Sequence, residues 1–259
     1  MKKSKNKFKQ MEEIMARLRA PDGCPWDKAQ THKSLLPFLI EEACEVRETI
    51  RKRKYDHLKE ELGDLLLQIF FHAQIAKEKK LFDMDGVIDE LMDKIVKRHP
   101  HIFDKSHKKL KTPEQVRRTW EEIKVKEKNR VSILEGIPKS LPSLLYAQRL
   151  QNRASEVGFD WENIDDVIAK MKEEEEELLL SYREKDKKAM KEEIGDLFFA
   201  LVNVCRFINI DAEEALDLAN KKFEKRFKYI EKHAKKEKRN LKEMTLDEME
   251  LLWNKAKNR

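Results

Sequence analysis

The feature that most constrains the fold is an internal repeat, in which one acidic pattern occurs twice at a fixed spacing. The segment LIEEACEVRE at 39–48 matches MKEEEEELLL at 171–180, and EELGDLL at 60–66 matches EEIGDLF at 192–198. Corresponding residues lie 132 positions apart, and fifteen residues separate the two acidic clusters in both copies. The chain has only six glycines, yet both copies place one inside the second acidic segment. A tandem duplication explains these matches better than chance does, and it predicts two similar domains.

The repeat also sets the expected domain boundaries. KIVKR at 94–98 resembles KFEKR at 222–226, so the similarity continues downstream in the same order. We therefore expect an N-terminal domain at 10–128 and a C-terminal domain at 142–259. The connecting residues 129–141 contain a glycine and a proline, which interrupt helices, and are expected to form a linker.

Residue composition favours an all-α fold. Glycine and proline together contribute 13 of 259 residues, about 5%, against roughly 12% in average proteins. Turns between strands depend on these two residues, so a large β-sheet is disfavoured. Within each copy the apolar spacing predicts a helical hairpin, with helices at 34–52 and 58–76 in the first copy and at 164–183 and 187–208 in the second.

Two long apolar runs predict a homodimer. LLLQIFFHAQIA in the first copy and LFFALVNVC in the second are apolar nearly all round a helix, which is typical of buried helices. One helical hairpin offers too little cover for such runs. We therefore expect a second subunit to complete four-helix-bundle cores.

The repeated acidic residues have the spacing of a metal site. Carboxylates three residues apart share a helix face, and two antiparallel neighbouring helices can point four of them at one place. Their mutual repulsion beside an apolar core favours binding of a hard divalent cation. A solvated acidic face is the alternative. The candidate ligands are Glu42, Glu45, Glu61 and Asp64 in the first copy and Glu174, Glu177, Glu193 and Asp196 in the second.

The ligand types favour Mg²⁺, with Mn²⁺ as a substitute. Diiron helical bundles combine Glu with Glu-x-x-His pairs. Here the residue three positions after the first glutamate of each pair is Glu45 or Asp64, and not histidine. His72 lies eight residues beyond Asp64. A set of carboxylate oxygens suits Mg²⁺ or Mn²⁺, so redox chemistry is disfavoured.

Downstream cations could complete a site for a phosphate chain. Lys222 and Arg226 lie four residues apart on one predicted helix, as do Lys94 and Arg98 in the first copy. Cations beside a carboxylate-bound metal suit an anionic phosphate chain. A solvated basic helix face explains the same spacing equally well, because 221–242 is rich in lysine throughout.

Net charge and cysteine usage limit the classes of partner. Lys and Arg number 56 and Asp and Glu 50, a net charge of +6 that permits a nucleic-acid partner without requiring one. The three cysteines form no CxxC pair, so neither a disulfide framework nor a zinc ribbon is indicated. No run of 18 apolar residues occurs, and we expect a cytoplasmic protein without membrane contact. A second hypothesis is a non-catalytic helical regulatory or nucleic-acid-binding protein that uses 221–242.

These motifs resemble those of the MazG nucleoside triphosphate pyrophosphohydrolases, members of the all-α NTP pyrophosphatase superfamily. The signature of that family is EExxE, a spacer and then ExxD, which occurs here as EEACE with ELGD and as EEEEE with EIGD. Further stretches resemble the two-domain members of the family: LRAPDGCPWDKAQTHKSLLPFLIEE at 18–42, KRHPHIF at 97–103, WEEIKVKEK at 120–128, SLPSLLYAQRLQNRASEVGFDW at 140–161 and KFEKRF at 222–227.

The resemblance implies Mg²⁺-dependent hydrolysis of nucleoside triphosphates to monophosphate and pyrophosphate, by a homodimer with a house-cleaning or alarmone-lowering role. It implies metal ligands at the four acidic positions of the second copy, and either Glu173 or Glu174 is a candidate general base. Few polar side chains are evident to read a base, so broad nucleotide use is expected. The residues that match substrate-contacting positions are Lys170, Lys191, Glu192, Lys222, Arg226 and Trp253, although the residues alone favour packing of Trp253 in the core.

We expect the second copy to carry most of the activity. In the first copy KIVKR runs directly into HPHIF, where proline should end the helix early. The apolar helix of the first copy also has Phe71 where the second copy has the polar Asn203. The first copy is therefore expected to bind metal more weakly and chiefly to support the dimer.

Overall fold

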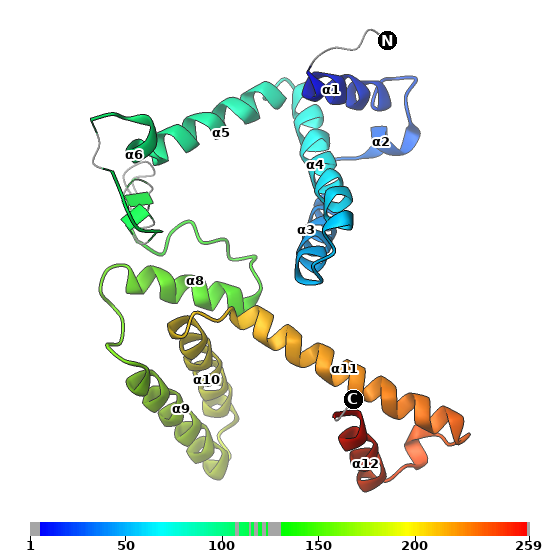
Figure 1. Ribbon diagram of the computed structural model, residues 1–259, viewed down its shortest axis with the longest axis vertical. Helices are drawn as coiled ribbons and strands as arrows, with labels where there is room; N and C mark the ends of the chain where they lie inside the picture. Colours follow the sequence, from blue (N-terminus) through cyan, green and yellow to red (C-terminus); the bar gives the residue numbers. More distant parts are fainter. Residues whose placement is uncertain are drawn as a thin grey trace. The chain divides into compact units, whose positions relative to one another are not determined.

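The computed structural model describes helices and their connections, with no strand among the described residues. The chain divides into two compact units, 1–120 and 121–259, and each is described by itself (Figure 1). The described residues are 6–106, 109–113, 115–116, 119–120, 123 and 131–257. The predicted domain end at 128, the first two residues of the predicted linker and the last two residues of the chain lie outside them. The all-α prediction is confirmed.

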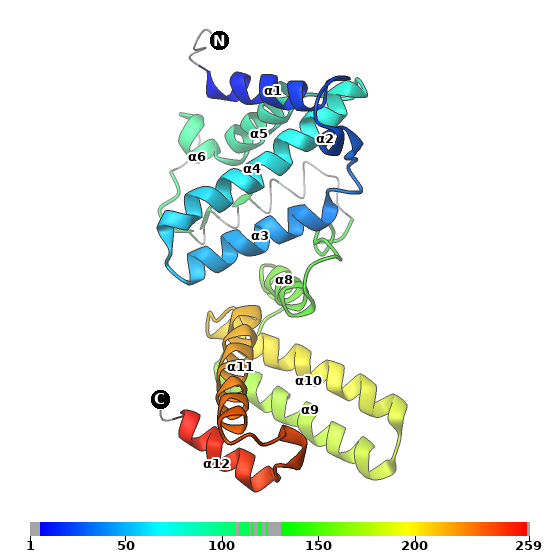
Figure 2. The same ribbon diagram turned by 90° about the vertical axis from the view of Figure 1, so that its right-hand side faces the viewer.

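The first unit is built around an antiparallel helical hairpin. Helices α3 and α4 lie side by side, and α1 and α5 both pack against α4 (Figure 2). Arg53 adopts a left-handed backbone conformation with φ 54° in the short turn between α3 and α4. The helices of this unit are α1 (Lys7–Leu18), α2 (Pro25–Ala29), α3 (Leu36–Arg51), α4 (Tyr55–Glu78), α5 (Met84–Arg98) and α6 (Pro100–Phe103).

The core of this unit lies at the C-terminal half of α4. Phe70 and Phe71 are 3% exposed, and they pack with residues of α1, α5 and the loop before α3. Burial of such side chains contributes about 1.5–3 kcal/mol each. The remaining members of this core are Met15, Leu35, Ala73, Ile75 and Met84.

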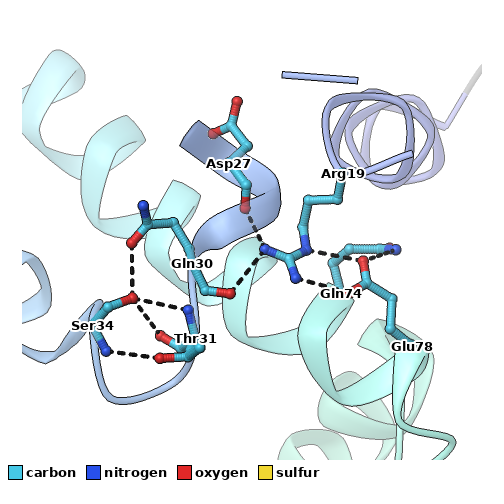
Figure 3. A network of polar contacts seen from close by, with 7 residues as sticks. All are labelled: Arg19, Asp27, Gln30, Thr31, Ser34, Gln74 and Glu78. Atoms are coloured by element: carbon cyan, nitrogen blue, oxygen red, sulfur yellow. Dashed lines mark hydrogen bonds and ion pairs between the residues drawn. The ribbon is translucent and has the colours of Figure 1, made fainter. Parts of the chain in front are cut away.

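Arg19 ties the loop after α1 to the end of α4 (Figure 3). Its guanidinium donates to both carboxylate oxygens of Glu78, at 2.9 and 2.8 Å, and also to the backbone carbonyls of Asp27 and Gln30. The Arg19 side chain is only 6% exposed, so these contacts satisfy a buried charge. The same contact holds the pKa of Glu78 below its ordinary value.

The second unit repeats the hairpin. Helices α9 and α10 lie side by side and antiparallel, and α8 packs against α10 (Figures 1 and 2). Lys185 takes a left-handed conformation with φ 59°, and the Asp186 side chain then caps α10 by accepting from two backbone N–H groups. The helices of this unit are α8 (Ser143–Ser155), α9 (Ile164–Glu184), α10 (Lys187–Phe207), α11 (Ala212–Lys236) and α12 (Leu246–Lys257), with a 3₁₀ turn at Leu241–Glu243.

A second core joins α11 to α12. Ile230 and Ala234 near the end of α11 pack with Met244 and Leu252, and Trp253 lies against this cluster. Figure 1 shows α11 leading away from the α9–α10 hairpin toward α12. The second unit therefore has a hairpin and a separate helical arm.

The predicted early end of the basic helix in the first copy is confirmed. Helix α5 ends at Arg98, and Pro100 begins the short helix α6. In the second copy α11 continues without a break over 25 residues. In the first copy the proline therefore divides into two helices a segment that forms one continuous helix in the second copy.

The apolar helices α4 and α10 are only partly covered within one chain, and the cover expected from a second subunit stays a prediction. In α10 the side chains of Ile194, Phe198 and Leu201 are 43%, 58% and 48% exposed. The equivalent stripe in α4, formed by Leu62, Leu66 and Ile69, is 49%, 37% and 40% exposed. Because these residues follow the spacing i, i+4, i+7, each hairpin presents one continuous apolar face.

Candidate active site

Three of the predicted acidic residues of the second copy meet between α9 and α10. Glu174, Glu177 and Glu193 each place a carboxylate oxygen within 4.8 Å of the other two. Glu174 is 7% exposed, whereas Glu177 is exposed and Glu193 is half-buried. The i, i+3 spacing on α9 places the first two carboxylates on the face toward α10, where Glu193 meets them.

Lys170 lies beside this cluster, one turn earlier on α9. Its Nζ atom is 2.7 Å from a carboxylate oxygen of Glu173 and 2.8 Å from one of Glu174. Hydrogen bonds from Lys170 to Glu173 and then Glu174 hold the pKa of Lys170 above its ordinary value. A fixed cation therefore borders the carboxylates.

The electrostatics of the cluster favour a bound cation. Partial desolvation raises the pKa of Glu177, and the negative charges of Glu174 and Glu193 raise it further. Carboxylates that repel one another at this separation are stabilised by a divalent cation, and oxygen ligands of this kind suit Mg²⁺. The residues present therefore fit the metal that the sequence predicts.

Asp196, the fourth predicted ligand, is not among the oxygens that lie within 4.8 Å of one another. It lines a cavity of about 590 Å³ together with Glu174 and Lys170, so the acidic cluster borders this cavity. The apolar part of the lining comes from Leu134, Leu150, Ala154, Phe159, Trp161, Phe199 and Ala200. A cavity of this size is typical of small-molecule sites, which range over roughly 300–1,000 Å³.

Polar groups in the cavity wall are held in fixed orientations. Gln151, which is 7% exposed, donates from Nε2 to the backbone carbonyl of Phe199 at 2.8 Å. Asn203 accepts on Oδ1 from Nε of Arg206 at 2.8 Å, and Arg206 in turn pairs with Asp160 at 2.9 Å. The cavity is therefore mostly apolar, with two oriented amides in its wall.

The predicted substrate-contacting residues of α11 and α12 are not among the residues that line this cavity. The guanidinium carbon of Arg226 is 5.2 Å from the centroid of the Trp253 ring, a cation–π distance. Lys222 lies exposed on the same helix as Arg226. None of the residues that line the cavity belongs to α11 or α12.

Lys191 and Glu192, also predicted to contact substrate, are exposed on the first part of α10. Glu192 forms an i, i+4 ion pair with Lys188, with an N–O distance of 3.9 Å. Neither residue lines the cavity. Among the predicted substrate residues, only Lys170 lies beside both the carboxylates and the cavity.

The first copy repeats the acidic cluster. Glu42, Glu45 and Glu61 place one carboxylate oxygen each within 4.8 Å of the others. Desolvation raises the pKa of Glu42, and the nearby charge of Asp64 is the next largest contribution. The pKa of Glu61 is raised in the same way, by desolvation and then by Glu45. The first copy can therefore hold a cation as well.

The two copies differ in the space behind the carboxylates. In the first copy Phe71 is buried, and its ring lies 6.3 Å from that of Trp26 in an edge-on arrangement. Asn203 occupies the matching position of α10 in the second copy, where it lines the cavity. In the first copy an aromatic side chain therefore fills a position that is polar and open in the second copy.

The fold and the site define an all-α protein with two helical hairpins, each of which carries a cluster of glutamates. Comparison with known families matches residues 30–103 and 162–230 to the MazG nucleotide pyrophosphohydrolase domain. Each match contains one hairpin and extends into the helix that follows it, α5 in the first copy and α11 in the second. The chain belongs to the MazG nucleotide pyrophosphohydrolase family.

Curated relatives extend this similarity to the whole chain. A Thermotoga maritima protein named nucleoside triphosphate pyrophosphohydrolase/pyrophosphatase MazG is 43% identical over 259 residues, covering 99% of this chain and 98% of the relative. The Escherichia coli K12 nucleoside triphosphate pyrophosphohydrolase is 40% identical, with 97% of each chain covered. The uncharacterized protein YabN of Bacillus subtilis is 46% identical, and there the match spans 52% of the relative.

The sequence patterns did not identify most residues of the cavity wall. Gln151 lies within an apolar stripe of α8 that includes Ala147, Leu150 and Ala154, and a polar residue at such a position is a usable signal. The difference between Phe71 and Asn203 is visible in the sequence, but the cavity is not.

No helix in the described part of the chain combines the length and apolarity needed to cross a bilayer.

Proposed function

We propose that the chain hydrolyses nucleoside triphosphates to nucleoside monophosphate and pyrophosphate, mainly in its second copy. The observation that carries this proposal is the carboxylate cluster of Glu174, Glu177 and Glu193 beside Lys170 and a cavity of about 590 Å³. The names of the relatives from Thermotoga maritima and Escherichia coli agree with this reaction.

The residues of the chain have distinct tasks in this reaction. Glu174, Glu177, Glu193 and Asp196 are the proposed ligands of a Mg²⁺ ion. Bound there, Mg²⁺ would neutralise phosphate oxygens and make a water molecule more acidic. Lys170 binds and orients the phosphate chain, because its charge lies on the same face as the carboxylates.

A glutamate of the cluster also has to accept a proton from the attacking water. Glu173 is the residue we favour, because its carboxylate is exposed and lies outside the group of three. Its hydrogen bond to Lys170 holds it near the phosphate chain. A base does not need to bind the metal, and a carboxylate outside the ligand set keeps an oxygen available to accept a proton.

We further propose that the working form is a homodimer. The exposed stripes of α4 and α10 occupy equivalent positions in the two hairpins, and both consist of large apolar residues. Contiguous exposed apolar faces mark protein–protein contacts. A second chain would cover these faces and complete four-helix cores.

Cysteine usage supports a cytoplasmic setting for this activity, because Cys24, Cys44 and Cys205 are all free thiols.

Broad use of nucleotides is also proposed, since contacts to metal and phosphate do not depend on the base.

The non-catalytic nucleic-acid hypothesis gains little support from α11, where Lys221 pairs with Asp217 and Lys228 with Glu224. These pairs reduce the positive charge that a nucleic acid would meet.

The experiment is to incubate the purified protein with each NTP and dNTP, in Mg²⁺ or in EDTA, and to measure pyrophosphate and monophosphate. Stoichiometric release of both in Mg²⁺, abolished by EDTA and restored by added Mg²⁺ or Mn²⁺, is the expected result. Absence of pyrophosphate from every nucleotide at high enzyme concentration would refute the proposal.

A further inference from the structure

Two histidines of the first unit face each other where the connection between α2 and α3 meets α4. His32 lies in this connection, and His72 lies in the C-terminal half of α4. Their Nδ1 atoms are 2.8 Å apart, and the planes of the two rings differ by only 4°. The ring centres are 5.1 Å apart, so both nitrogens lie between the ring centres and can share a hydrogen bond.

This hydrogen bond allows only one proton between the two nitrogens. One ring must donate from Nδ1, and Nδ1 of the other ring must be unprotonated to accept. Nε2 of His72 is buried without a partner among the described residues, and so is Oε1 of Gln68, one turn earlier on α4. Because this oxygen can only accept, its position favours a proton on Nε2 of His72. Nδ1 of His72 is then the acceptor, and His32 is the donor.

The pair can take up one further proton, but a second one breaks the contact. A proton on Nε2 of His32 leaves the hydrogen bond in place with a charged donor. The next proton would have to bind Nδ1 of His72, and two Nδ1–H groups cannot bond to each other. Desolvation lowers the pKa of His72, and the charge of His32 lowers it further. The contact is therefore stable above the ordinary histidine pKa of 6.5 and weakens as the pH falls below it.

The other charged groups that face α4 from neighbouring elements are paired or lie elsewhere along the helix. None of them in the described part of the chain contributes to the pKa shift of His72. They are Glu12 of α1 and Asp83 before α5, which lie 3.8 and 3.9 Å from Lys77, Arg19 after α1, which pairs with Glu78, and Glu42 and Glu45 of α3, which lie with Glu61.

We propose that His32 and His72 form a pH-sensitive latch, which holds the turn before α3 against α4 at neutral pH and releases it as the pH falls. The turn moves as one unit because Thr31 and Ser34 each donate a backbone N–H to the side-chain oxygen of the other, at 2.9 and 3.1 Å (Figure 3). Histidine is the side chain whose charge ordinarily changes in this pH range.

The latch matters for α3 because this helix has no cap of its own. Its N-cap residue is Leu35, whose side chain offers no hydrogen bond to the first turn of the helix. The same helix carries Glu42 and Glu45 of the first-copy cluster. Release of the turn therefore loosens the start of the helix that carries these carboxylates.

The second copy provides an internal comparison. The positions 132 residues after His32 and His72 are Ile164 and Val204, and neither side chain titrates. The start of α9 is capped by Asn163, whose side chain accepts from the backbone N–H of Asp166 at 3.0 Å. The matching helix start of the second copy thus has a neutral cap in place of the latch.

Hydrogen exchange of the full-length protein, measured by mass spectrometry, tests the latch at the start of α3. Between pH 7.5 and pH 5.5, on either side of the ordinary histidine value of 6.5, the ratio of released to latched turn should rise by about tenfold. After correction for the intrinsic pH dependence of exchange, the protection of residues 31–40 should fall by the same factor. The start of α9 should keep its protection.

Two variants separate the pair from other histidines. His72→Gln keeps an acceptor for His32 but does not titrate, so it should remove the pH dependence. The matched control is His57→Gln, which replaces an exposed histidine on the same helix and should leave the pH dependence unchanged. Circular dichroism checks that each variant is folded. Protection that is independent of pH in the wild type, or a pH dependence that survives in His72→Gln, would overturn the proposal.

Nitrogen-15 spectra of the histidine rings test the hydrogen bond itself in the wild-type protein. At pH 7.5 one of the two Nδ1 atoms should carry a proton and the other should not, with the resonances assigned by their loss in His32→Gln or His72→Gln. Two unprotonated Nδ1 atoms would also overturn the proposal, because neither ring could then donate to the other. Neither measurement depends on pyrophosphate release, so the latch and the proposed reaction are tested separately.

Discussion

The Nζ atom of Lys170 lies 2.8 Å from a carboxylate oxygen of Glu174, so the most buried glutamate of the cluster has a cation beside it on its own helix. The charge of Lys170 therefore has opposite effects on the binding of a phosphate chain and on the binding of a metal ion. Its charge attracts a phosphate chain, and the same charge opposes a metal ion bound to the neighbouring carboxylates. The two effects can be separated by substitution.

Replacement of Lys170 by Met should move two measured quantities in opposite directions. The KM for a nucleoside triphosphate should rise by roughly tenfold, because a charge-assisted hydrogen bond is lost. The affinity for Mn²⁺ alone, measured by titration calorimetry, should increase by about two- to fivefold, the size expected for one partly exposed charge. Lys172→Met, on the same helix, is the control. A parallel loss of both affinities would contradict this account.

The division of labour between the two copies can be tested by neutralising matched carboxylates. Glu177→Gln or Asp196→Asn should lower pyrophosphate release by at least about a hundredfold, on the order of 2.7 kcal/mol of transition-state stabilisation. The matched changes Glu45→Gln and Asp64→Asn should cost less than about fivefold. Equal damage by the first-copy changes, in protein that remains folded, would show that both copies turn over substrate.

The exposed apolar stripe of α10 predicts the effect of a charge at its centre. Phe198 is 58% exposed in the single chain, so Phe198→Glu should leave the fold intact but place a charge in the proposed dimer contact. Light scattering should report a dimer for wild type and a monomer for the variant at micromolar concentration. Leu246→Glu on α12, a residue that is 72% exposed, is the control. A wild-type protein that is monomeric would refute the proposed dimer.

Arg19 predicts a large loss of stability in the first unit. Arg19→Met removes one donor that serves Glu78 and two backbone carbonyls, and Gln74 then still donates to Glu78. This loss should cost about 2–4 kcal/mol of unfolding free energy. Urea denaturation followed by circular dichroism measures this change. Arg17→Met is the matched control, because Arg17 and its partner Asp22 are both well exposed. A loss of similar size in the control would show that the contacts of Arg19 are not responsible.

The ion pair of Arg239 with Glu248 predicts a pH-dependent contribution to stability. Arg239 donates to both carboxylate oxygens, at 2.8 and 2.9 Å, and this lowers the pKa of Glu248 to about 2. A carboxyl group whose pKa is lower in the folded state stabilises the protein above its unfolded pKa, here near the ordinary value of 4.5. That contribution is lost as the pH falls from 4.5 toward 2.

Calorimetric Tm values for wild type and Glu248→Gln should therefore differ at pH 7 and converge as the pH approaches about 2. In an Arg239→Gln background the same substitution should show a smaller pH dependence. A difference in Tm that stays constant between pH 7 and pH 2.5 would rule out the ion pair as its cause.

The hairpins were predictable because their signals are local. The periodicity placed the second hairpin at 164–183 and 187–208, and the structure has Ile164–Glu184 and Lys187–Phe207. Asparagine and aspartate caps lie at the start of both helices, so the residues that fix the ends are next to the residues that fix the helix. The meeting of three glutamates followed from the same spacing.

The cavity was not predictable in this way because it depends on distant contacts. The orientation of the Gln151 amide depends on the carbonyl of Phe199, which lies on another helix, and no spacing rule relates the two positions. What covers the apolar helices is likewise not determined by local spacing. Periodicity identifies an apolar face, but it does not say whether the same chain covers it.

The break between α5 and α6 bears on the entropy of binding. In α11 the cations Lys222 and Arg226 lie in the middle of a helix that is anchored by the packing of Ile230 on α12, so their backbone is already ordered before any ligand arrives. In α5 the corresponding Arg98 is the last helical residue, with Pro100 directly beyond its neighbour. A helix end is the least constrained part of a helix, so an anion at Arg98 would meet a less constrained backbone than an anion at Arg226. One proline thus gives similar charges in the two copies a different degree of backbone preorganisation.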